Sequence, residues 1–174
     1  MRPPLPLMLC VALTAAVPAV AADTPGARQD TASAGGLTVV QFANPDPQAV
    51  LAAWTNPDAT GVHLKTDRRG RRDQPIYTFV LFRGCTTDKD GACTLTADYE
   101  VMDPKGQPYV QKKGVRTWIA KPPAPAPEYT LATGYLGLVV EHKDSPGPYT
   151  VRMTLTDQVS GVVLHTEQTL DIAE

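Results

Sequence analysis

Apolar and polar residues alternate over much of the second half of the chain. Residues 94–103 and 149–156 each place an apolar residue at every second position, with threonines and charged residues between them. This period of two predicts half-buried antiparallel strands. Residues 75–82 are almost continuously apolar, which predicts a strand that is covered on both faces. The apolar side of the 94–103 strand is formed by Leu95, Ala97, Tyr99 and Val101.

Shorter apolar runs predict further strands, and turn residues separate them about every ten residues. These strands are expected at 37–42, 62–66, 115–119, 129–133, 135–141 and 162–172. One short helix is expected among them, because Asp46 can cap a helix and Pro47 is tolerated in its first turn; it would run to Trp54. The pattern therefore predicts an all-β fold, an immunoglobulin-like antiparallel sandwich with one short N-terminal helix, in a single domain over residues 37–174.

The N-terminus has the pattern of a secretory signal peptide at residues 1–22. Its apolar run is too short to span a membrane, and small residues permit cleavage after Ala21 or Ala22. The protein is therefore expected in the periplasm or outside the cell, with no transmembrane segment after cleavage. Residues 23–36 contain no large apolar residue and predict a flexible leader.

Export changes the expected chemistry of the three cysteines. Cys10 is lost with the signal peptide, and an exported protein is expected to join Cys85 and Cys93 in a disulfide. Seven residues separate these two cysteines, so the bond is expected to close a hairpin between the strands at 75–82 and 94–103. A redox pair is the alternative, but such pairs have the C-x-x-C spacing.

Two stretches of the sequence resemble known proteins. Residues 147–172, GPYTVRMTLTDQVSGVVLHTEQTLDI, resemble the closing hairpin of immunoglobulin-like and fibronectin-type-III-like domains. The stretch from Phe82 to Gly106 is similar to that of small exported bacterial proteins that share a short cystine hairpin. The resemblance extends over about residues 45–173 and implies an exported β-sandwich, but it attaches no activity and no functional residue to the chain.

Residues suited to catalysis are few in this sequence. The formal net charge is -2, which argues against nucleic acid as the main partner. The chain has three serines, Ser33, Ser145 and Ser160, and none lies in a G-x-S-x-G motif. Asp98 and Glu100 could act as a carboxylate pair, but the polar outer face of a strand explains them. We therefore expect no enzymatic activity and no cofactor.

Two patterns raise the question of a metal. His63, His142 and His165 lie on separate predicted strands without the close spacing of a metal site, although folding can bring such residues together. Residues 86–91 match part of a calcium loop, but Ala97 stands where the pattern needs glutamate, so a turn explains the aspartates. The alternative function is therefore a periplasmic copper or zinc carrier, or a metal-dependent enzyme, that uses the three histidines.

The densest charge is a run of four arginines in a predicted loop: Arg68, Arg69, Arg71 and Arg72. A solvated loop with flanking aspartates is the simple explanation. The functional one is a loop that binds an anionic surface, because guanidinium groups pair bidentately with phosphate and carboxylate groups. The sequence thus favours a non-enzymatic periplasmic or secreted module that binds another envelope protein or an anionic envelope surface.

Overall fold

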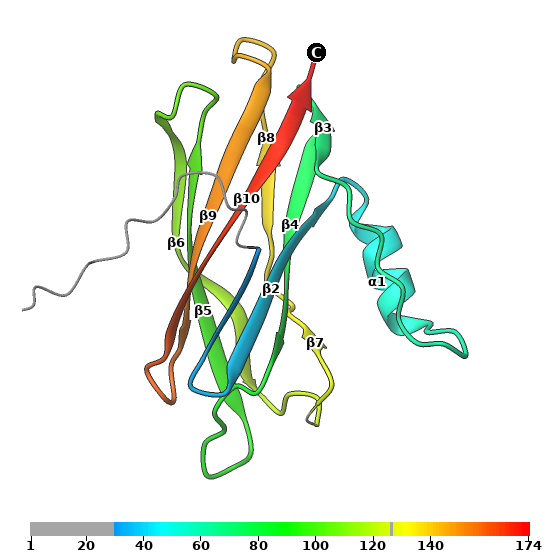
Figure 1. Ribbon diagram of the computed structural model, residues 1–174, viewed down its shortest axis with the longest axis vertical. Helices are drawn as coiled ribbons and strands as arrows, with labels where there is room; N and C mark the ends of the chain where they lie inside the picture. The colour runs from blue at the N-terminus through cyan, green and yellow to red at the C-terminus, as the bar shows by residue number, and fades with distance from the viewer. Residues whose placement is uncertain (1–29, 126) are drawn as a thin grey trace, which may run out of the picture.

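The computed structural model describes residues 30–125 and 127–174 (Figure 1). Within these residues the chain is mostly β and forms ten strands and one helix. In chain order the elements are β1 (Thr31–Ala34), β2 (Leu37–Asn44), α1 (Pro47–Thr55), β3 (Arg69–Arg71), β4 (Pro75–Arg83), β5 (Cys93–Met102), β6 (Pro108–Lys121), β7 (Thr130–Leu131), β8 (Leu136–Val139), β9 (Gly147–Asp157) and β10 (Val163–Ala173). In this part of the chain, no helix is long and apolar enough to cross a membrane.

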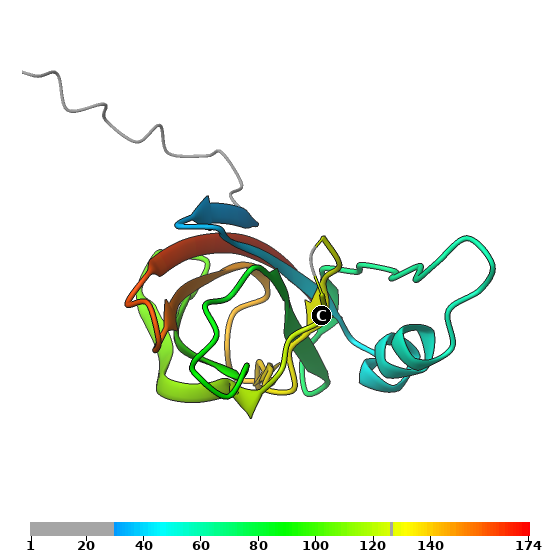
Figure 2. The ribbon, with the colours of Figure 1, turned by 90° about the horizontal axis from the view of Figure 1, so that it is seen from below.

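The strands form two sheets with a core between them. The first sheet has the strand order β1-β2-β4-β7, and β8 also pairs with β4; the second has the order β3-β10-β9-β5-β6. Paired strands are antiparallel except β3, which runs parallel to β10. Figure 2, viewed from below, shows both sheets curving around the core, with α1 standing outside them on one side.

The alternation of side chains along each strand determines which of them enter the core, as the sequence predicts. The apolar residues expected on the inner face of β5 are at most 2% exposed. β9 contributes the same pattern, with its threonines and Arg152 on the outer face. The inner residues of these two strands are Leu95, Ala97, Tyr99, Val101, Tyr149, Val151, Met153 and Leu155. Each of the two strands therefore has one buried and one polar face.

The helix α1 begins where the sequence predicts it. Asp46 Oδ1 accepts a hydrogen bond from Ala49 N at 3.0 Å, and Pro47 lies in the first turn. The helix packs against the outer face of the first sheet and forms a second apolar cluster there. The buried residues of this cluster are Phe42, Val50, Phe79 and Leu131. β4 is therefore covered on both faces, as its continuous apolar run predicts.

The predicted flexible leader ends earlier than expected. Residues 31–34 form β1, which pairs with β2 across a turn at Gly35 and Gly36. Both glycines have positive φ, which residues with a side chain rarely adopt, so this turn folds the small polar residues back as an edge strand. The predicted signal peptide at residues 1–22, and residues 23–29 of the leader, lie outside the described residues.

The strand predicted at residues 62–66 is wrong. These residues follow α1 and return toward the sheets without joining either of them. Their apolar residues contact the outer cluster instead, since Leu64 packs against it. We call residues 47–66 the arm, because α1 and the segment after it extend away from the two sheets in Figure 1.

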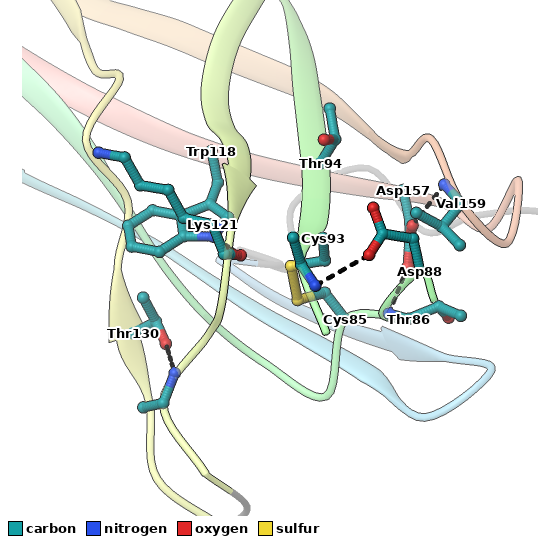
Figure 3. The surroundings of a disulfide bond; sticks show 12 residues. Cys85, Thr86, Asp88, Cys93, Thr94, Trp118, Lys121, Thr130, Asp157 and Val159 are labelled. Carbon is teal, nitrogen blue, oxygen red and sulfur yellow. Dashed lines mark hydrogen bonds between the residues drawn. A yellow bond between two sulfur atoms is a disulfide. The ribbon is translucent and has the colours of Figure 1, made fainter. Parts of the chain in front are cut away.

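The disulfide between Cys85 and Cys93 is formed, with Cα atoms 6.2 Å apart (Figure 3). The hairpin predicted around it is wrong, because β4 belongs to the first sheet and β5 to the second. A short loop between two strands has the same sequence pattern whether the chain turns back within one sheet or crosses to the other. The disulfide therefore closes the crossover between the two sheets.

Candidate functional site

The four arginines predicted to form a loop for anionic surfaces do not lie in a free loop. Residues 69–71 form β3, which pairs with β10 at the edge of the second sheet. Arg68 Nη2 lies 2.6 Å from Asp30 Oδ2, and Arg69 Nε lies 3.0 Å from Asp67 Oδ1. Hydrogen bonds from Arg69 lower the pKa of Asp67, so the carboxylate is held in its charged form.

Arg72 joins three separate segments of the chain through hydrogen bonds. Its Nη1 donates hydrogen bonds to the carbonyl oxygens of His142 at 2.7 Å and Asp144 at 3.2 Å, and its Nη2 pairs with Glu174. Only 12% of its side chain is exposed. Arg71 is exposed and forms no ion pair within the described ranges. Three of the four guanidinium groups are thus paired with carboxylates of the protein, Arg68 and Arg72 with little exposure and Arg69 on the surface.

The three histidines lie in separate surroundings. His63 Nε2 is 2.6 Å from Thr60 Oγ1 in the arm. His142 Nδ1 is 3.9 Å from Asp73 Oδ2, and His165 lies on the outer face of β10. Among residues 30–125 and 127–174, no group of three or more histidine, cysteine or acidic side chains is placed to hold a metal ion. The fold therefore does not bring the three predicted ligands together.

The acidic residues considered for calcium binding or glycoside chemistry are held by local hydrogen bonds. Asp88 Oδ1 accepts from two backbone N–H groups of the cystine loop, at 2.9 and 3.0 Å. Figure 3 shows Asp88 beside the disulfide. Asp98 Oδ1 accepts from Gly114 N at 2.7 Å, and Glu100 Oε1 accepts from Gln111 Nε2 at 2.9 Å. These contacts stabilise the cystine loop and the pairing of β5 with β6. This structural role accounts for the three acidic residues.

An apolar groove of about 680 Å³ lies between the arm and the first sheet. We call it the arm groove. Its apolar and aromatic lining comes from the arm, from β4 and from the proline-rich segment after β6: Trp54, Val62, Leu64, Leu81, Ala124 and Tyr129. Glu128 is the charged residue of the lining, and it forms no ion pair with any residue that the structure describes.

Aromatic side chains support the residues that line the arm groove. The rings of Phe42 and Phe79 are stacked, with their centroids 5.3 Å apart, and Trp54 packs against this cluster. The guanidinium carbon of Arg83 lies 4.9 Å from the centroid of the Tyr129 ring. This cation–π contact holds the Tyr129 ring against the sheet. Trp54 and Tyr129, which line the groove, are thus each packed against a neighbouring group of the first sheet.

A second groove, also of about 680 Å³, opens between β6 and β8. We call it the edge groove, because within the described residues β6 pairs only with β5 and β8 pairs only with β4. Three large apolar side chains of its lining are exposed to solvent: Val110 by 39%, Tyr135 by 39% and Val139 by 46%. The open side of the two-sheet stack thus exposes several apolar side chains.

Most charged groups around the edge groove are paired. Tyr109 OH donates a hydrogen bond to Asp144 Oδ2 at 2.7 Å. Burial and this hydrogen bond raise the pKa of Tyr109 to about 12, so its hydroxyl stays protonated. Lys143 Nζ lies 2.5 Å from Glu141 Oε2. Lys112 also lines the groove and forms no ion pair with any described residue.

Neither groove was predicted from the sequence. Each is lined by segments that are far apart in the chain, so no local motif reveals it. One signal was present, because the outer positions of β4, Tyr77, Phe79 and Leu81, are as apolar as its inner ones. A strand of this kind must have its outer face covered, and the cover is the arm.

Comparison with other proteins gives no family. No protein-family model matches the sequence, and no curated protein matches it in sequence. One solved structure that matches is a family 123 glycoside hydrolase from Clostridium perfringens, with a TM-score of 0.39 and 6% sequence identity. The match covers 60% of this chain and 22% of that structure, so the chain spans less than a quarter of that enzyme. A likeness this weak carries no argument about fold or activity.

Proposed function

We propose that this protein is a non-enzymatic binding module, exported to the periplasm or secreted, that binds another envelope protein through the arm groove. The observation that carries the proposal is the groove itself, an apolar concave surface that includes Trp54 and Tyr129. Apolar concave surfaces of this size are typical of sites that bind ligands or other proteins.

The lining of the arm groove indicates the chemistry of the partner. Tryptophan and tyrosine contribute most to binding when a partner covers them, because they bury a large area with few rotatable bonds. Glu128 offers an acidic group at the same surface. The partner is therefore a protein segment with large apolar side chains and a basic residue that pairs with Glu128.

The proposal extends to the class of fold. We propose that the two sheets form a sandwich of the immunoglobulin-like type, and that the protein is related to small exported bacterial proteins with a short cystine loop. The antiparallel pairing of nearly all strands and the Cys85–Cys93 disulfide support this view. In such folds a rigid pair of sheets carries the binding surface on its loops and edges.

Site-specific photo-crosslinking tests this function. Val62 lines the arm groove and is 39% exposed, and Val163 on β10 is 45% exposed, so Val163 is a matched control. In the protein's own host, a benzophenone amino acid replaces Val62 or Val163, one at a time. The benzophenone at position 62 should form a crosslink to one partner protein, and the benzophenone at position 163 should not. The purified partner should then bind Val62→Asp about tenfold more weakly or worse, because a charge enters an apolar contact, and bind Val163→Asp normally.

Three results would overturn the proposal. One is equal crosslinking from both positions, and another is crosslinking to lipid or glycan alone, which would favour an anionic envelope surface. The third is a partner that binds Val62→Asp and Trp54→Ala as tightly as the wild type. Because Val62 is exposed, its substitution should leave the fold intact, which circular dichroism will check.

A further inference from the structure

We propose that the edge groove accepts an extended strand of another protein, whose side chains toward the groove are apolar except for one carboxylate that pairs with Lys112. This surface is separate from the arm groove, so the inference goes beyond the proposed function. It rests on the free strand edges, on the exposed apolar residues between them and on the charge of Lys112.

The backbone of both groove walls is available for pairing. β6 and β8 belong to different sheets, and no backbone hydrogen bond joins them within residues 30–125 and 127–174. The gap closes at one end, where the N–H groups of Thr133 and Gly134 donate to Thr117 O at 3.1 and 3.0 Å. At the other end of the gap, Tyr109 OH of β6 donates a hydrogen bond to Val139 O of β8 at 3.5 Å. Between these two contacts, the facing edges of β6 and β8 pair with no other strand in the described residues, and such edges are the template for adding another strand.

The side chains between the edges suit an inserted strand. Val110 and Val139 come from opposite walls, and both are exposed. An added strand would cover them with every second side chain, because side chains alternate between the two faces of a strand. Val115 and Leu138 lie deeper in the same lining and would contact those side chains as well. The occupant therefore has apolar residues at alternate positions.

Lys112 indicates where the occupant carries charge. Its register partner in β5 is Tyr99, whose side chain is buried, so Lys112 points to the same inner side and into the groove. The next residue, Lys113, lies instead on the outer face of the second sheet, near Glu100 and Arg152. A wholly apolar strand would cover an unpaired ammonium group at Lys112, which is unfavourable; a strand with a carboxylate at that position would neutralise it.

The same charge argues against a second copy of this chain as the occupant. Antiparallel pairing of two β6 strands across the groove, centred on Lys112, would place the Lys112 side chains of both copies directly opposite each other. Like charges at such close range destabilise a strand pair. We therefore expect the occupant to be a strand of a different protein.

A synthetic peptide tests the inference. The probe alternates valine and threonine, is long enough to span β8, and has glutamate in place of its central valine; a second probe has lysine there. The wild-type protein should bind the glutamate peptide about fivefold more tightly than the lysine peptide, as expected for one partly exposed ion pair. Lys112→Glu should reverse this preference, and Lys113→Glu, with the same change of charge on the outer face, should leave it unchanged.

Two further measurements separate strand pairing from other modes of binding. N-methylation of the glutamate peptide at alternate residues removes the N–H groups of one edge and should abolish binding. Hydrogen exchange should show protection of residues 136–139 or 110–115 when the unmodified peptide is bound. The inference is overturned if the glutamate peptide does not bind saturably, if the N-methylated peptide binds equally well, or if Lys113→Glu acts like Lys112→Glu. A dimer of the free protein whose β6 is already protected would also overturn it.

Discussion

Replacing Asp157 with alanine tests the contact that ties the β9–β10 turn to the cystine loop. The carboxylate is fully buried at the end of β9. Its Oδ2 accepts a hydrogen bond from Thr86 N at 2.8 Å, and its Oδ1 accepts from Val159 N at 2.9 Å (Figure 3). The same Oδ1 also accepts from Ser160 N at 3.3 Å. Burial raises the pKa of Asp157, but these backbone donors outweigh burial and lower the pKa below 3.8.

The cost of the substitution follows from these contacts. A hydrogen bond to a charged group contributes about 1.5–3 kcal/mol, and Asp157→Ala removes two short ones and leaves their N–H groups without that acceptor. We therefore expect the free energy of unfolding to fall by about 3–5 kcal/mol, a large share of the roughly 5–15 kcal/mol typical of a domain. The melting temperature should fall by about 10 °C.

Asp103→Ala is the matched control, measured by urea denaturation with tryptophan fluorescence. Asp103 Oδ1 also accepts from two backbone N–H groups of a hairpin turn, those of Lys105 at 2.9 Å and Gln107 at 2.8 Å. It is only half-buried and makes no hydrogen bond to another loop in the described residues. Its loss should cost about 1 kcal/mol. An Asp157 variant no less stable than the Asp103 variant would refute this account of the contact.

The pH dependence provides a second check on Asp157. A carboxyl group whose pKa is lowered on folding stabilises the folded state above its unfolded pKa, and this stability is lost as the pH falls through the folded pKa. The ordinary aspartate pKa is 3.8, so the stability difference between wild type and Asp157→Ala should be constant near neutral pH and shrink below about pH 4. A difference that grows in acid would contradict the assigned direction of the shift.

The other predictions concern the core, the disulfide and the arginines. Removing the disulfide with Cys85→Ala and Cys93→Ala should lower the free energy of unfolding by about 2–3 kcal/mol, measured against the oxidised wild type, because the crossover loop gains freedom when unfolded. Phe79→Ala should cost about 3–5 kcal/mol in urea denaturation, since its ring is buried beneath the arm. Arg72→Ala should cost about 2–3 kcal/mol and Arg71→Ala less than about 0.5 kcal/mol in the same assay, because of the two only Arg72 has a mostly buried side chain that donates to backbone carbonyl groups. Equal losses for the two arginines would refute their different placement.

The elements that sequence reasoning predicted well are those whose pattern is local. The alternation in β5 and β9 identified their buried faces, and the Asp46-Pro47 pair identified the start of α1. β1 was missed because its residues are small and polar, although the Gly35-Gly36 pair is a known hairpin signal. Because the residues before this turn are not apolar, the sequence predicts a flexible leader there. The strand becomes visible only through the pairing of residues 31–34 with β2.

The errors concern relations between distant parts of the chain. The cystine loop was expected to be a hairpin, because nothing local distinguishes a return within one sheet from a crossover to the other. The arginine run was expected to face solvent, but Arg68 and Arg72 meet Asp30 and Glu174, which lie near opposite ends of the described chain. The three histidines and both grooves likewise depend on which strands become neighbours, and periodicity does not determine that.

The two proposed binding surfaces are connected through the first sheet. Tyr135 is in the wall of the edge groove, and its ring centroid lies 5.1 Å from that of Phe79 and 5.7 Å from that of Tyr77. Phe79 is also part of the cluster beneath the arm groove. A strand that displaces the Tyr135 ring would alter this packing, and any resulting change in affinity must be reciprocal between the two ligands. If the ring stays in place, the protein joins two partners without coupling them; if it moves, binding at one groove regulates the other.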